Sequence, residues 1–166
     1  VLDKNYRPRF TSITAAILVF VGIVGLADVL GVNSYSSFWS RFERMEGYLM
    51  MLHLFAYFLI LISVLRTKMD WLVFFHFFVI AGTLVGGYGV LQKLGIKESI
   101  QGGEARIDGT IGNPTYLAAY LIFIIMFSVL LWLHASKRWQ KYLYSAQILF
   151  SLFILYFSAT RGAILA

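Results

Sequence analysis

Five long apolar runs, separated by short polar connections, constrain the fold of this chain more than any other feature. A membrane-spanning helix needs about 20 mostly apolar residues, and each run approaches that length. Inside a bilayer every backbone polar group must be bonded within the chain, and a helix achieves this by itself. The sequence therefore predicts an all-α, polytopic membrane helix bundle with about five transmembrane helices, over residues 13–32, 48–65, 71–91, 115–134 and 143–159.

The two ends of the chain indicate that the bundle continues. A sixth helix is expected to begin at residues 162–166, and the chain starts at Val1 rather than Met. We therefore interpret residues 1–166 as a single transmembrane domain that is a fragment of a longer multi-helix membrane protein. Glycines inside the runs, such as Gly82, suit close helix packing in lipid. The segment Gly86-Gly87-Tyr88-Gly89 is expected to loosen the end of the third run, since glycine weakens a helix.

The charge pattern predicts an orientation. Hydrophobic residues make up 60% of the chain and charged residues only 13%, which excludes an ordinary soluble domain. If residues 1–12 are cytoplasmic, the connections 66–70 and 134–142 are cytoplasmic too. These segments hold eight basic and two acidic residues, whereas the opposite side holds six of each. The positive-inside rule thus accounts for the whole net charge of +6 without a nucleic-acid partner.

A glycine-containing polar loop precedes the fourth apolar run. Asn113 is a suitable helix N-cap, and Pro114 suits the first helical position. Gly109 and Gly112 permit φ angles and close approaches that other residues resist. Unpaired N–H groups and the positive dipole end of a helix attract anions, so this loop and Arg106 indicate a phosphate-binding site. The alternative is a capped loop that only turns the chain between two membrane helices.

Two further outer-face features carry basic residues. In residues 37–47, alternating charges stand beside Phe38 and Trp39. This segment is either an amphipathic turn in the membrane interface or a site where Arg41 or Arg44 holds an anionic lipid head group. Arg161 is flanked by apolar segments, where an Arg faces a bound anion or extends its side chain to the interface. The planar guanidinium suits phosphate because it matches two oxygens at once.

Other residues give weaker indications of chemistry. The three histidines, His53, His76 and His134, are predicted at different depths, so a shared metal site is not expected. Asp28 could pair with an outer Arg. Apart from His53 and His76, the helix centres are expected to be apolar, and the outer arginines stay at one face. A transporter should place polar groups along a path through the bilayer, so this pattern favours an enzyme at the outer leaflet.

Two motifs about 40 residues apart carry a family resemblance. The first is Gly109-Thr-Ile-Gly-Asn-Pro-Thr-Tyr-Leu-Ala-Ala-Tyr-Leu121, and the second is Ser158-Ala-Thr-Arg-Gly-Ala-Ile-Leu-Ala166. Together they resemble motifs of the O-antigen ligase and O-antigen polymerase superfamily. Residues 37–47 also look like the first outer loop of many members.

The resemblance implies a function and a location. Members transfer a glycan from an undecaprenyl-pyrophosphate carrier to an acceptor hydroxyl on a lipid, a glycan or a protein. They need no metal or cofactor and act at the outer face of the bacterial inner membrane, among membrane lipids. Their proposed catalytic His lies in a later outer loop, and no His follows His134 here, so no catalytic residue is assigned. The predicted pyrophosphate-binding residues are Arg161, Arg106, Gly112, Asn113 and Arg44. The alternative function is a non-enzymatic polysaccharide transporter or flippase component.

Overall fold

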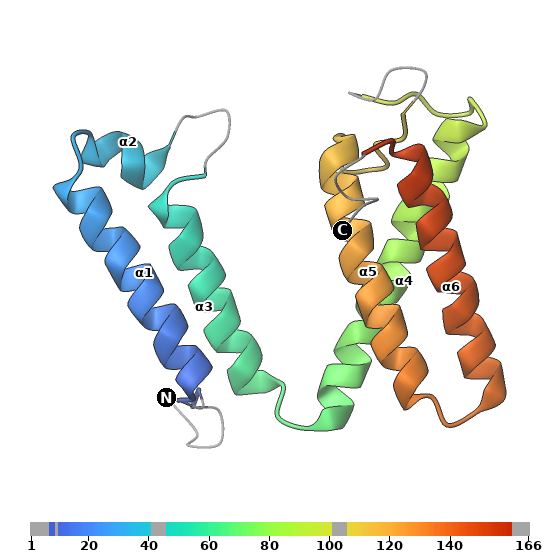
Figure 1. The fold of residues 1–166 in the computed structure, drawn as a ribbon, viewed down its shortest axis with the longest axis horizontal. Coiled ribbons are helices and arrows are strands. Elements are labelled where there is room, and N and C mark those ends of the chain that lie inside the picture. Colours follow the sequence, from blue (N-terminus) through green and yellow to red (C-terminus); the bar gives the residue numbers. More distant parts are fainter. Residues whose placement is uncertain (1–6, 9, 41–45, 101–105, 161–166) are drawn as a thin grey trace. The chain divides into compact units, whose positions relative to one another are not determined.

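The computed structural model describes residues 7, 8, 10–40, 46–100 and 106–160. Every regular element within these ranges is an α-helix, as Figure 1 shows, so the all-α prediction is confirmed for this part of the chain. In chain order the helices are α1 (Ser12–Leu30), α2 (Ser34–Trp39), α3 (Tyr48–Val64), α4 (Lys68–Lys93), α5 (Pro114–His134) and α6 (Arg138–Phe157).

Each predicted apolar segment coincides with a helix, but the helices differ in length and polarity. Three of them, α1, α4 and α5, are long and apolar enough to cross a membrane, which indicates a membrane protein. The apolar helix α3 has 17 residues, and α6 begins with a polar turn at Arg138, ahead of the predicted start. The count of five spans therefore stays a prediction. The predicted sixth helix lies outside the described residues.

The chain divides into two compact units, Val1–Thr67 and Lys68–Ala166. In the first unit α1 and α3 are antiparallel neighbours, and α2 contacts both (Figure 1). The Tyr48 hydroxyl donates to the Val21 carbonyl oxygen over 3.1 Å. This contact depends on Gly25, because a Cβ there would lie 2.5 Å from the Tyr48 hydroxyl oxygen. Tyr48 therefore joins the first turn of α3 directly to the backbone of α1.

In the second unit, α5 packs against both α4 and α6. The buried residues of α5 recur every three or four positions, which places them on one helical face. They include Leu117, Leu121, Ile124, Ser128 and Leu131, and none of these is more than 2% exposed. This face is where α5 packs against its two neighbours.

The glycines of α4 do not loosen its end, contrary to the prediction. Helix α4 continues without a break to Lys93. A Cβ at Gly82 would lie within 2.8 Å of three Ile124 side-chain atoms, and one at Gly86 would lie 2.7 Å from the Phe150 ring. These glycines let α5 and α6 approach closely, and the resulting packing outweighs the lower helix propensity of glycine. The predicted role of glycine in close helix packing is thus confirmed for Gly82 and Gly86.

The interior of the second unit is more polar than predicted. Gln147 is 7% exposed, and its Oε1 accepts a hydrogen bond from the Thr83 hydroxyl over 2.8 Å. Its Nε2 donates to the buried Ser151 hydroxyl over 3.1 Å. Nearby, the Tyr144 hydroxyl is hydrogen-bonded to His76 Nε2. The expectation of helix centres that are apolar apart from two histidines was wrong, because it overlooked Gln147 and the hydroxyls that satisfy it.

Candidate functional site

The start of α5 is confirmed as predicted. Asn113 is the N-cap and Pro114 the first helical residue, while Gly109 and Gly112 adopt φ angles of 60° and 75° in the preceding loop. The Asn113 side-chain oxygen accepts from the backbone N–H groups of Thr115 and Tyr116, over 2.9 and 3.3 Å. Because the cap already engages these two groups, an anion at this helix end must share them with Asn113 or replace its side chain.

Arg106 attaches the loop to the end of α6. Its Nε donates to the Ser158 carbonyl oxygen over 3.0 Å, and its Nη2 donates to the Thr160 hydroxyl over 3.3 Å. The adjacent Ile107 N–H bonds to the Phe157 carbonyl oxygen over 3.2 Å. A cation beside the last carbonyls of a helix is also favoured by the helix dipole. These contacts use two of the five N–H donors of a guanidinium, so Arg106 has a defined structural role in addition to any ligand it binds.

A sharp turn follows α6 and brings the chain back to α5. Ala159 has a φ of 52°, a left-handed conformation that is unusual for a residue other than glycine. The Thr160 hydroxyl lies 3.3 Å from the Pro114 carbonyl oxygen and accepts the bond from Arg106. The loop 106–114, which includes the start of the first sequence motif, and residues 158–160 of the second motif therefore meet at one end of the second unit.

Gln92, in the last turn of α4, holds the loop from its other side. Its Oε1 accepts from the Gly109 N–H over 2.8 Å, and its Nε2 donates to the Asp108 carboxylate over 2.7 Å. Nε2 also lies 3.1 Å from the Glu98 carbonyl oxygen. The Asp108 side chain has no exposed surface, so its charge depends on such bonds. Sequence analysis missed Gln92, whose only signal is an uncharged polar side chain near the end of an apolar helix.

Ile107 fills the space between the helices beneath this polar loop. It is 2% exposed and belongs to a cluster of buried residues with Leu117, Leu121 and Ile154. A Cβ at Gly89 of α4 would lie 2.8 Å from the Ile107 side chain, so the absence of a side chain at Gly89 makes room for the loop. Apolar packing below and the Gln92 and Arg106 hydrogen bonds above fix the position of the loop.

The predicted site residues have different outcomes. Arg106, Gly112 and Asn113 lie in this single loop, at the ends of α4, α5 and α6. Arg161 and Arg44 lie outside the described residues, and so does Arg41. Of the described residues, no group of three or more His, Asp or Glu side chains could hold a metal ion. Each of the three histidines instead has its Nδ1 within 2.8 Å of the carbonyl oxygen one turn earlier in its own helix.

The loop 106–114 combines three features that can bind an anion. It offers the half-buried guanidinium of Arg106, the capped start of α5 and the two loop glycines. Comparison of the chain with protein-family models, with curated proteins and with solved structures finds no match.

Proposed function

We propose that the full chain is an O-antigen ligase-like glycosyltransferase, which moves a glycan from undecaprenyl pyrophosphate to an acceptor hydroxyl at the outer face of the bacterial inner membrane. The observation that carries the proposal is the contact between Arg106 and the Ser158–Thr160 turn. It brings the second motif against the loop that leads into the first motif, and the Thr160 hydroxyl also lies 3.3 Å from the Pro114 carbonyl oxygen of the first motif.

The chemistry assigns a role to each part of this loop. The bond between the anomeric carbon and the pyrophosphate oxygen breaks as the acceptor oxygen attacks, and negative charge develops on the leaving pyrophosphate. Arg106 and Arg161 would stabilise that charge as preorganised cations. The first-turn N–H groups of α5 would also stabilise the negative charge if the phosphate replaces the Asn113 side chain as their hydrogen-bond acceptor. We assign the removal of the acceptor proton to no residue of 1–166.

The proposal predicts that Arg161→Lys in the full chain reduces glycan transfer by about tenfold or more, since Lys keeps the charge but loses the planar two-oxygen fork. Arg161→Ala should be at least as damaging. The measurement is transfer in vitro from a lipid-linked donor by protein in detergent. The matched control is Arg138→Lys at the exposed start of α6, which should transfer normally. Normal transfer by the Arg161→Lys protein would remove this residue from the site.

A polysaccharide transporter or flippase component is the second candidate, and one observation favours it. The Thr83, Gln147 and Ser151 side chains form a polar network between α4 and α6, with Thr83 and Gln147 near the middle of their helices, and a transporter needs polar groups along its path. Reconstituted vesicles distinguish the two functions. A transporter moves the lipid-linked glycan across the bilayer without changing it, whereas a transferase consumes it and releases undecaprenyl pyrophosphate.

The proposed orientation can be tested with single cysteines, because residues 1–166 contain none and any cysteine elsewhere in the full chain can be replaced by serine. We expect Ser99→Cys in the full chain to react with an impermeant thiol reagent added outside the cell. Ser136→Cys, in the short connection between α5 and α6, should react only after the membrane is opened. This follows because the net positive charge lies in residues 1–12, 66–70 and 134–142. Labelling of position 136 but not 99 from outside would reverse the orientation.

A further inference from the structure

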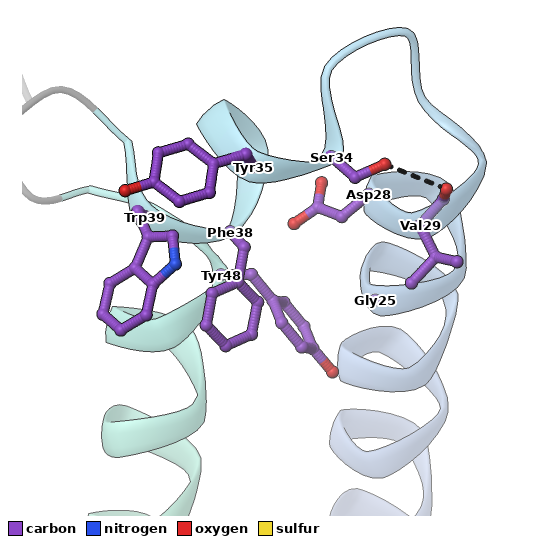
Figure 2. A pocket seen from close by; sticks show the side chains of 8 residues that line it. All are labelled: Gly25, Asp28, Val29, Ser34, Tyr35, Phe38, Trp39 and Tyr48. Atoms are coloured by element: carbon purple, nitrogen blue, oxygen red, sulfur yellow. Dashed lines mark hydrogen bonds between the residues drawn. The ribbon is translucent and has the colours of Figure 1, made fainter.

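The first unit contains a pocket that the proposed transferase site does not use. It lies where the end of α1, the short helix α2 and the first residue of α3 meet, as Figure 2 shows. Its volume is about 340 Å³, within the range of small-ligand sites. Four aromatic side chains line it, together with the carboxylate of Asp28; the aromatic residues are Tyr35, Phe38, Trp39 and Tyr48.

Among the described residues that line the pocket, Asp28 carries the only charge. No hydrogen bond or ion pair joins its carboxylate to any described residue. Two of the three lining hydroxyls already donate a hydrogen bond, Ser34 to the Val29 carbonyl oxygen and Tyr48 to the Val21 carbonyl oxygen, each over 3.1 Å. The described lining therefore combines one negative charge with ring surfaces.

Three sources of negative potential coincide in this pocket. Asp28 lies in the last turn of α1, where the helix dipole is itself negative, and that turn contains no basic residue. The negative end of the helix dipole therefore disfavours the Asp28 carboxylate and favours a cation bound beside it. The faces of the aromatic rings carry negative charge density as well. An anion would be repelled here, whereas a cation would interact favourably with all three.

The lining also discriminates between kinds of cation. A metal ion needs several oxygen ligands. An organic ammonium group needs only a negative charge and ring faces, which is how aromatic cages recognise quaternary ammonium.

We propose that this pocket binds the ammonium head group of a membrane phospholipid, of the ethanolamine or choline type. The α1 helix is long and apolar enough to cross a membrane, and Asp28 lies in its last turn. Trp39 and Tyr35 are exposed beside the pocket, and such side chains favour the head-group level of a bilayer. The proposal is independent of glycan transfer, because it concerns a different unit and a ligand of opposite charge.

The test measures binding of tetramethylammonium to the full chain in detergent by isothermal titration calorimetry, with sodium chloride at equal ionic strength as the blank. Asp28→Asn keeps the shape of the side chain and should weaken binding by about tenfold. Trp39→Leu should weaken it as well. Glu98→Gln, which removes an exposed carboxylate that does not line the pocket, should bind like the parent. Circular dichroism checks that each variant keeps its helices.

A second arm identifies the source of the ammonium group. Native mass spectrometry of protein released from nanodiscs should show phosphatidylethanolamine retained over phosphatidylglycerol, and Asp28→Asn should lose that preference. Tetramethylammonium binding without lipid retention would overturn the lipid assignment in favour of a soluble amine. Equal binding by the parent and Asp28→Asn, or no binding by either, would overturn the proposal that this pocket binds an ammonium group. Binding that appears only after Arg41→Gln or Arg44→Gln would also overturn it, because the chain's own arginine would then be the cation.

Discussion

Gln92→Leu is expected to lower the stability of the second unit by about 4 kcal/mol, because it removes one hydrogen bond from a fully buried carboxylate and the acceptor of a loop N–H group together. Leucine has nearly the same size as glutamine, so the change tests the hydrogen bonds rather than the packing. The Asp108 carboxylate loses its 2.7 Å bond from Nε2, and the Gly109 N–H loses its 2.8 Å bond to Oε1. We expect a large fall in the midpoint of reversible unfolding in mixed detergent micelles.

Gln140→Leu provides the matched control for this prediction. Gln140 accepts a single hydrogen bond, from the Lys137 N–H over 3.2 Å at the start of α6, and that bond is exposed. Losing such a cap costs about 1 kcal/mol. If the two variants unfold at the same midpoint, Gln92 does not hold the loop. Gln92→Glu should be as damaging as Gln92→Leu, since it places a second carboxylate against Asp108.

Gly82→Leu is expected to destabilise the contact between α4 and α5 by about 3 kcal/mol, the upper end of the usual cost of overpacking. A Cβ at this position would already lie within 2.8 Å of three Ile124 side-chain atoms, and Ile124 has no exposed surface. The remaining side-chain atoms of a leucine would need still more room. The expected result is a lower unfolding midpoint, measured in the same detergent system.

The same substitution at Gly87 separates packing from helix propensity. Gly87 lies in the same helix, but a Cβ there would meet no atom within 4 Å. Gly87→Leu should therefore leave the unfolding midpoint unchanged or raise it, since leucine is the better helix former. Equal loss of stability in the two variants would show that α5 does not pack against Gly82 as described.

Features governed by neighbouring residues could be predicted from the sequence. Asn113, Pro114 and the two loop glycines act within one turn of each other, so their residue types alone predicted the helix start and its cap. The apolar runs predicted the helices because a continuous apolar run long enough to span a bilayer is a local feature that indicates a membrane helix by itself. The helix Ser34–Trp39 was not predicted, because six residues are too short for a periodic pattern.

Contacts between distant residues could not be predicted. Arg106 was interpreted as a phosphate ligand, yet its observed partners, Ser158 and Thr160, are more than 50 positions away. Gln92 and its partner Gly109 are 17 positions apart, on two sides of a loop whose path the sequence does not specify. Gly86 was expected to weaken its helix, because only the packed structure reveals the Phe150 ring against it.

The polar network between α4 and α6 has a consequence for how the chain enters the bilayer during synthesis. The Thr83 and Ser128 hydroxyls each lie 2.8 Å from a carbonyl oxygen one turn earlier, so their helices can enter lipid alone with these groups satisfied. The Gln147 amide accepts its hydrogen bond from Thr83 on another helix. Helix α6 is also not among the three long apolar helices. We therefore expect α6 to enter the bilayer only together with α4, which is made earlier, rather than as an independent helix.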